Sequence, residues 1–303
     1  MLPADLRARL VGLDGVDSPV VVACSGGPDS LTLLAVSQDL ALDPVAVHVD
    51  HGLRAGSGAE ADVVAEHAAR IGARFGAVHA PVTPGPNLEA RARAARYEAL
   101  DRSRRTFGAS VVLTGHTADD QAETVLLNLL RGSASAGLGA MAPRRGDVVR
   151  PLLGVRRAET EAVCAELGFI PVRDPTNDDT RLRRNWIRHD ALPHLSAGAD
   201  RDLVPVLTRQ AALLRAESEF LDELAAAGWP AGAPLASTLA ALPDVLARRA
   251  VRRWLGSPPP SLADVERVLA VARGECRATE LAGGRRVSRH QGRLEVARGT
   301  VLP

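Results

Sequence analysis

The sequence contains no lysine, so arginine supplies every permanently positive side chain. This absence excludes a Walker A phosphate site, which needs a lysine directly after its last glycine. The three cysteines, Cys24, Cys164 and Cys276, stand apart and form no Cys-x-x-Cys pair. They therefore provide neither a zinc ribbon nor a thiol relay, and we expect them to be reduced.

Long apolar runs and a signal peptide are also missing, because no apolar segment approaches membrane-spanning length and the first residues carry charge. These absences predict a cytoplasmic protein. Aromatic residues make up only 3% of the chain, which leaves few platforms for stacking bases; Trp186 and Trp254 stand beside arginines. With 303 residues, of which 46% are hydrophobic, the chain can form one large and one smaller domain.

The net charge of +1 does not by itself indicate a nucleic-acid-binding protein. The arginines are unevenly distributed, however, and exceed the acidic residues from Arg248 to the end of the chain. Such an excess favours contact with phosphates, although an arginine-rich solvated face is the alternative.

Apolar segments that read as strands alternate with helical patterns in the first half of the chain. The expected strands cover residues 20–24, 44–49, 74–82, 110–114 and 148–152, and the expected helices 31–36, 60–71, 88–107, 117–130 and 155–167. This alternation predicts an α/β domain with a mostly parallel, Rossmann-like sheet and right-handed crossovers. Later segments predict helices over 203–227, 240–254 and 262–273, then short antiparallel strands over 279–296.

The first predicted strand ends in the sequence Ser25-Gly26-Gly27-Pro28-Asp29-Ser30. Paired glycines let backbone N–H groups surround an anion, and proline favours the first position of the helix that follows. The positive end of that helix would add to the attraction. We therefore predict a phosphate cradle of a non-Walker type at the carboxyl edge of the sheet.

Two further polar clusters, His48 to Arg54 and Gly115 to Thr124, follow the second and fourth predicted strands. Carboxyl ends of neighbouring parallel strands converge, so the site is expected to be composite. Asp120 and Glu123 share a helix face, and Asp120 with Asp29 would hold Mg²⁺ together with substrate phosphates. Capping of the helix by these carboxylates is the alternative. A transition-metal site at His48, Asp50 and His51 is disfavoured, because no thiolate accompanies them.

Three arginines, Arg181, Arg184 and Arg188, follow helical spacing and predict one basic face suited to backbone phosphates. Salt bridges with nearby aspartates are the alternative. On the long helix 88–107, Glu89 and Arg93 are expected to face the site.

The loop from Ser25 to Ser30 resembles the signature of the N-type ATP pyrophosphatases, a PP-loop superfamily with an adenine nucleotide alpha hydrolase-like fold. The further motifs, in order, resemble those of the tRNA(Ile)-lysidine synthetases; they are His48 to Arg54, Asn87 to Tyr97, Gly115 to Thr124, Arg131-Gly132, Gly137 to Met141, Arg150 to Leu152, Asp174 to Asn177, and Arg184-Asn185 with Arg188. The resemblance covers residues 20–188. It implies a short form that lacks the extra terminal domain of longer relatives.

The resemblance implies ATP-dependent ligation of free lysine to C2 of the wobble cytidine of an isoleucine tRNA with a CAU anticodon. ATP would adenylate the cytosine O2 atom, the lysine amine would displace AMP, and a homodimer is plausible. His51, His116, Asp119 and Glu123 are open candidates for the base that frees the amine. The alternatives are another PP-loop enzyme, such as a tRNA thiolase, or a protein that binds ATP and tRNA without catalysis.

The resulting assignment gives every candidate residue a role. The catalytic set is Asp29, Asp120, His116 and Glu123; the ATP-binding set is Ser25, Gly26, Gly27, Pro28, Asp29, Ser30, His48 and Asp50; the tRNA or substrate set is Glu89, Arg93, Arg181, Arg184 and Arg188; and the Mg²⁺ ligands are Asp29 and Asp120. We expect an ATP pyrophosphatase catalytic domain over 1–200, a helical connector over 201–234 and a small α+β tRNA-binding domain over 235–303.

Overall fold

The computed structural model describes residues 3–52, 58–83, 85–172, 175–230 and 234–298. The chain divides into two compact units, residues 1–213 and 214–303. The division falls inside helix α10 (Leu203–Gly228), within the segment that the sequence predicts as a connector. Within the described residues, no helix is both long and apolar enough to cross a membrane.

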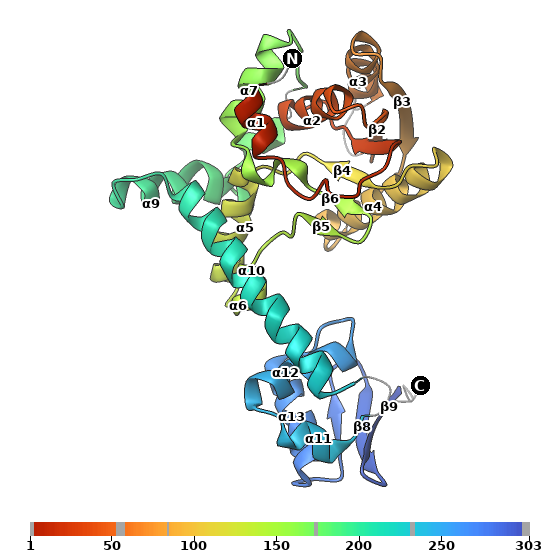
Figure 1. The fold of residues 1–303 in the computed structure, drawn as a ribbon, viewed down its shortest axis with the longest axis vertical. Coiled ribbons are helices and arrows are strands. Elements are labelled where there is room, and N and C mark those ends of the chain that lie inside the picture. Colours follow the sequence, from red (N-terminus) through yellow and green to blue (C-terminus); the bar gives the residue numbers. More distant parts are fainter. Residues whose placement is uncertain (1–2, 53–57, 84, 173–174, 231–233, 299–303) are drawn as a thin grey trace. The chain divides into compact units, whose positions relative to one another are not determined.

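The first unit is built on a six-stranded sheet with the strand order β3-β2-β1-β4-β6-β5 (Figure 1). All neighbouring strands are parallel except β5, which runs antiparallel to β6 at the edge. The strands are β1 (Val20–Ala23), β2 (Pro44–Asp50), β3 (Arg74–His79), β4 (Val112–Thr114), β5 (Arg144–Arg145) and β6 (Val148–Val149). This arrangement confirms the Rossmann-like fold class predicted from the sequence.

Helices connect these strands and continue beyond them. They are α1 (Ala4–Ala8), α2 (Pro28–Asp39), α3 (Gly58–Arg70), α4 (Leu88–Thr106), α5 (Ala118–Leu130), α6 (Ser135–Leu138), α7 (Arg157–Glu166), α8 (Arg183–Trp186) and α9 (Leu192–Gly198), with 3-10 turns at Pro151–Gly154 and Pro175–Asp178 and a π-helical turn at Ile187–Ala191.

The valines of β1 pack into two different layers because successive strand residues point to opposite faces. Val20 and Val22 belong to a core with helices α2, α3 and α7. Val21 belongs to a second core, which includes Leu100 of α4. The sheet is thus covered on both faces, as a continuous apolar run predicts.

Prolines account for two differences from the expected elements. The predicted strand over 148–152 ends at Val149, and Pro151 begins a 3-10 helix. The predicted helix over 240–254 is two helices, α11 (Ala236–Ala241) and α12 (Asp244–Leu255), and Pro243 is the N-cap of the second. Proline lacks the N–H that a strand ladder or a helix interior needs.

The second unit packs helices against a three-stranded antiparallel sheet in the order β7-β8-β9 (Figure 1). Its strands are β7 (Ala278–Leu281), β8 (Arg285–His290) and β9 (Arg293–Arg298), and α13 (Leu262–Arg273) joins α11 and α12 in the core. Trp229 and Trp254 pack edge to face, with ring centroids 5.6 Å apart.

Two arginines of β8 cap the carboxyl ends of helices α12 and α13. Arg285 Nη1 donates to Leu255 O (3.0 Å), and Arg289 Nη1 donates to Ala272 O (3.1 Å). The last carbonyls of a helix lack partners within it and carry partial negative charge, so guanidinium groups stabilise these ends.

A capping box holds the start of α13 and leads to a prediction. Asp264 accepts hydrogen bonds from Ser261 Oγ (2.7 Å) and Ala282 N (3.3 Å), and the Ser261 bond is the main reason why its pKa falls to about 2.

Asp264→Ala should lower the free energy of unfolding by about 1–2 kcal/mol. In the parent protein this stabilisation is complete above the ordinary carboxyl pKa of 3.8 and is lost as the pH falls through about 2.

Urea unfolding of the full chain, followed by the fluorescence of Trp229 and Trp254 in a Trp186→Phe background, measures this loss. Asp244→Ala is the matched control, because the Asp244 pair with Arg273 is exposed and should contribute less than about 1 kcal/mol. Equal losses in the two variants would contradict the capping role.

Candidate active site

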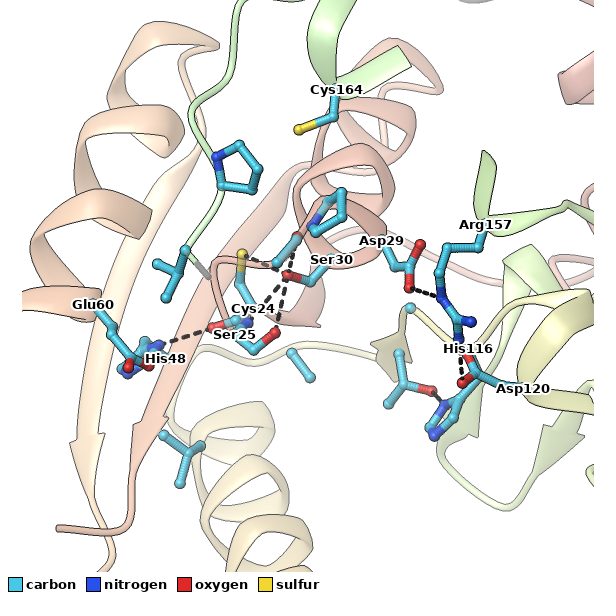
Figure 2. Close-up of a pocket in the computed structure, with 18 of the residues that line it drawn as sticks. Cys24, Ser25, Asp29, Ser30, His48, Glu60, His116, Asp120, Arg157 and Cys164 are labelled. Carbon is cyan, nitrogen blue, oxygen red and sulfur yellow. Dashed lines mark hydrogen bonds and ion pairs between the residues drawn. The ribbon is translucent and has the colours of Figure 1, made fainter. Parts of the chain in front are cut away.

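A cavity of about 940 Å³ opens at the carboxyl ends of β1, β2 and β4 (Figure 2). The three polar clusters predicted from the sequence all contribute to its lining, through residues such as Ser25, His48 and His116. The parallel sheet thus brings together segments that lie far apart in the chain, as expected for strand ends that meet at one edge.

The backbone carbonyls of the loop between β1 and α2 are engaged in hydrogen bonds within the protein. Three of these oxygens accept hydrogen bonds, in the pairs His48 Nδ1 to Cys24 O (3.1 Å), Val172 N to Gly26 O (2.9 Å) and Ser30 Oγ to Gly27 O (2.9 Å). Pro28 begins α2, so the first N–H groups of that helix have no partner within it. With its carbonyls engaged, the loop can present N–H groups to an anion.

Gly26 has a positive φ of 81° and lies directly under Val172. A Cβ atom at position 26 would stand 2.6 Å from Val172 Cγ2, so a larger residue would collide with this neighbour. The sequence motif predicts a phosphate-binding role for Gly26, but it does not reveal the close packing of Val172 on this glycine. Two requirements, a left-handed backbone and close packing, therefore act on one position.

The segment that carries Val172 is anchored by helix α3. His67 is buried and its Nε2 lies 3.0 Å from Ile170 O, while Arg70 donates to Leu167 O and Gly168 O, both at 3.0 Å. The turn after α7 is thereby fixed, and Val172 beyond it contacts the loop. No local sequence signal links His67 to this contact.

Three carboxylates and three arginines form a cluster beside the loop. The carboxylates are Asp29, Asp120 and Glu123, and the arginines are Arg157, Arg184 and Arg188. Figure 2 shows Arg157 between Asp29 and Asp120, at 3.6 Å from the first and 2.9 Å from the second. Glu123 is 1% exposed and contacts all three arginines at 2.7–3.2 Å. The formal charges of this acid–arginine cluster balance.

The two carboxylate oxygens of Asp120 have separate partners. Oδ2 accepts from Thr117 N (2.8 Å) and completes a capping box at the start of α5. Oδ1 accepts from Arg157 (2.9 Å) and Arg184 (3.1 Å). The capping alternative raised by the sequence is therefore realised through Oδ2, whereas the role of Asp120 as a Mg²⁺ ligand stays a prediction.

Burial changes the protonation of two residues that line the cavity. The pKa of Asp29 rises to about 6, chiefly because its carboxylate is desolvated, although Thr160 and Arg157 oppose the shift. The pKa of His116 falls to about 3, again chiefly through burial, with Arg150 and Arg184 adding to the shift. His116 is consequently neutral near pH 7, and its Nδ1 lies 2.9 Å from Thr114 Oγ1.

The expected single basic face at residues 181–188 does not form. Arg181 precedes α8 and pairs with Asp179 in solvent (2.8 Å), so it does not share a helix face with the other two. Arg184 and Arg188 instead point into the acid–arginine cluster. The helical spacing therefore predicts a shared face correctly only for Arg184 and Arg188, which lie within the helical segment.

Several other predicted residues lie outside the cavity lining. Asp50 accepts a hydrogen bond from Gly52 N (2.8 Å), Arg93 lies 5.0 Å from the Tyr97 ring centroid, and Glu89 is exposed. Their roles in binding stay predictions. The motif residues Leu53, Arg54 and Asp174 lie outside the described residues.

Sequence analysis misses Arg157 and Thr160, which both contact Asp29. One signal was present, because Arg156 and Arg157 occupy the N-cap and first position of α7. Cations are unfavourable at the positive end of a helix, so two arginines there indicate nearby carboxylates. Arg156 indeed pairs with Asp119 at 3.1 Å.

The described residues contain no group of three or more histidine, cysteine or acidic side chains suited to holding a metal ion. A magnesium ion bound through one or two carboxylates and phosphate oxygens would not need such a group.

Comparison with known proteins agrees with this geometry. Residues 8–195 match the family described as the PP-loop domain. The chain is 40% identical over 300 residues to the tRNA(Ile)-lysidine synthase of Thermobifida fusca, covering 92% of each chain. It is 43% identical over 249 residues to that of Mycobacterium leprae, covering 79% of this chain and 76% of the relative.

The fold also resembles that of the U34-tRNA thiolase NcsA from Methanococcus maripaludis, with a TM-score of 0.55 at 19% identity. That match covers 70% of this chain and 76% of the thiolase, and it supports the fold alone. The PP-loop match and the 40% identity over nearly the full length go further. The chain belongs to the tRNA(Ile)-lysidine synthase family.

Proposed function

We propose that this protein uses ATP to attach free lysine to C2 of the wobble cytidine in an isoleucine tRNA with a CAU anticodon. The observation that carries the proposal is the strand-end cavity, in which an N–H-presenting loop lies beside the acid–arginine cluster. The names of the relatives support an isoleucine tRNA as the substrate, and the match to the PP-loop domain supports the use of ATP.

The first step forms a bond between cytosine O2 and the α-phosphorus and breaks the bond to pyrophosphate. Charge that develops on the departing phosphates would be stabilised by the backbone N–H groups of Gly27, Asp29 and Ser30 at the start of α2, since Pro28 has no N–H. Arg157 and Arg188, which line the cavity, would add positive charge from the side of the acid–arginine cluster.

Asp29 is a suitable ligand for Mg²⁺. Burial desolvates its carboxylate and raises its pKa to about 6, and a divalent cation bound to the carboxylate would offset this cost of burial. When bound, the ion would neutralise phosphate charge. Asp120 already contacts Arg157 and Arg184 through Oδ1, so it would serve as a second ligand only after those contacts rearrange.

In the second step, the lysine nitrogen attacks C2, AMP leaves, and a base takes the proton of the amine. Three of the four candidates are poorly suited: His116 has a pKa of about 3, Asp119 is held by Arg156, and Glu123 is saturated by three arginines. A base works best when its pKa lies near the working pH and its lone pair is accessible.

His51 is the candidate that the contacts favour. It lines the cavity, and its Nδ1 lies 2.9 Å from Ala80 O. A carbonyl oxygen only accepts, so Nδ1 carries the hydrogen, and in the neutral form of the ring Nε2 is the nitrogen that can accept a proton. We assign His51 Nε2 as the acceptor of the amine proton.

Incubation with ATP, Mg²⁺, labelled lysine and a CAU-anticodon isoleucine tRNA tests the proposal. We expect label in the RNA together with release of AMP and pyrophosphate, and none in a transcript whose wobble cytidine is replaced by uridine. Label from a sulfur donor instead of lysine would indicate a thiolase. Binding of ATP and tRNA without any turnover would indicate a sensor.

Asp29→Asn should stop the first step. The amide keeps the shape of the side chain but cannot supply the negative charge that holds a metal ion. Pyrophosphate release should fall by at least about 100-fold, as is typical when a group that stabilises transition-state charge is lost. Affinity for tRNA, measured by filter binding, should stay within a factor of about two; an equal loss of tRNA binding would show that Asp29 acts elsewhere.

His51→Gln should stop the second step and spare the first. Pyrophosphate release should continue while lysine incorporation falls by about 100-fold, the usual scale for a lost general base. Adenylated tRNA should accumulate and be visible by mass spectrometry of nuclease digests. The comparison with Asp29→Asn separates the steps, and a His51→Gln enzyme that loses both reactions equally would refute this assignment.

A further inference from the structure

A second cavity, of about 380 Å³, lies in the C-terminal unit between two turns. One turn follows α13 and includes Gly274, Cys276 and Arg277; the other joins β8 to β9 and includes Gly292. Arg289 and His290, at the end of β8, complete the lining. We refer to this cavity as the basic notch.

The charge of the basic notch comes from the side chains that line it. Several arginines elsewhere in the unit pair with acids, namely Arg248 with Glu266 at 2.6 Å, Arg273 with Asp244 at 2.7 Å and Arg286 with Glu280 at 3.1 Å. Among the described residues, the lining of the basic notch contains two arginines and a histidine but no carboxylate. An acid-free concavity of this kind attracts anions.

The basic notch is also preorganised. Arg289 N donates to Arg277 O (3.0 Å), which joins the two turns through their backbones. Arg289 Nη1 donates to Ala272 O (3.1 Å), so its guanidinium is fixed at the end of α13 and keeps four further N–H bonds. A fixed guanidinium loses little conformational entropy when it binds an anion.

We propose that the basic notch binds a phosphate group of an RNA backbone. This inference rests on the proposed function, which gives the protein an RNA substrate, and it names a contact in the unit that does not contain the catalytic cavity. Guanidinium groups pair with phosphate through parallel N–H bonds. Aromatic rings are absent from the lining, within the described residues, so the notch suits a phosphate better than a stacked base.

Cys276 provides a direct reporter, because it is the exposed cysteine and lines the basic notch. Cys24 and Cys164 are buried at the catalytic cavity, and burial raises the pKa of the Cys24 thiol to about 11. Iodoacetamide should therefore modify Cys276 first, as followed by peptide mass spectrometry. The CAU-anticodon tRNA should slow this reaction several-fold, whereas ATP alone should leave it unchanged.

Salt dependence of tRNA binding by the full-length chain provides a second measurement. Arg277→Gln should weaken binding and reduce the slope of log K against log salt by about 1, the value expected for one lost phosphate contact. Arg286→Gln is the matched control, since it removes the same charge from a residue of β8 that pairs with Glu280. Its slope should stay close to that of the parent protein.

The outcomes separate this inference from the proposed function. If tRNA binds but Cys276 reacts at its original rate, or if the two arginine variants have equal slopes, the inference is overturned while lysine incorporation can stand. If tRNA protects Cys276 and Arg277→Gln lowers the slope, the inference holds even for a protein that incorporates no lysine.

Discussion

The contact of Arg157 with several carboxylates is the interaction on which the rest of the site depends. Its guanidinium reaches Asp29, Asp120 and Glu123, which lie on two different helices. Burial by itself lowers the pKa of Arg157, but the charges of these carboxylates outweigh that effect and raise the pKa above its ordinary value. A planar group with five N–H bonds can serve three acceptors at once, whereas an ammonium is a single compact charge. In a chain without lysine, arginine performs this role throughout.

The acid–arginine cluster has an energetic cost that only mutual pairing offsets. Removing one member of a buried ion pair costs about 3–5 kcal/mol, because the remaining charge lacks water. Arg157 begins α7, Arg184 lies in α8, and Glu123 lies in α5. The charges therefore hold three helices at the edge of the sheet, and the same contacts place positive groups beside the Ser25–Ser30 loop.

Much of the fold follows from local patterns that the sequence carries. The apolar run at β1 and the Ser25–Ser30 turn predict the sheet edge and its loop, since both depend on residues near one another in the chain. Convergence of the clusters at His48 and His116 also follows, because parallel strands with right-handed crossovers place their ends together. The ends of β6 and α11 can also be predicted from the sequence, because Pro151 and Pro243 cannot donate the backbone hydrogen bonds that would continue these elements.

The remaining parts of the site depend on contacts between distant residues. Two contacts join segments that lie more than 100 residues apart: the hydrogen bond from Thr160 to Asp29 and the packing of Val172 on Gly26. No periodic pattern in the sequence predicts either contact. The helical spacing predicts that Arg184 and Arg188 share one face, but it does not predict whether that face is exposed to solvent or contacts acidic side chains. Only the three-dimensional arrangement distinguishes these cases.

The divided carboxylate of Asp120 has a consequence for how such a site can evolve. One oxygen caps helix α5 and the other pairs with arginines beside the cavity, so a mutation here changes the start of the helix and the local charge balance together. A glutamate would move its oxygens further from the backbone and a serine would remove the charge. Two separate requirements, the helix cap and the charge balance, therefore restrict which residues this position can accept.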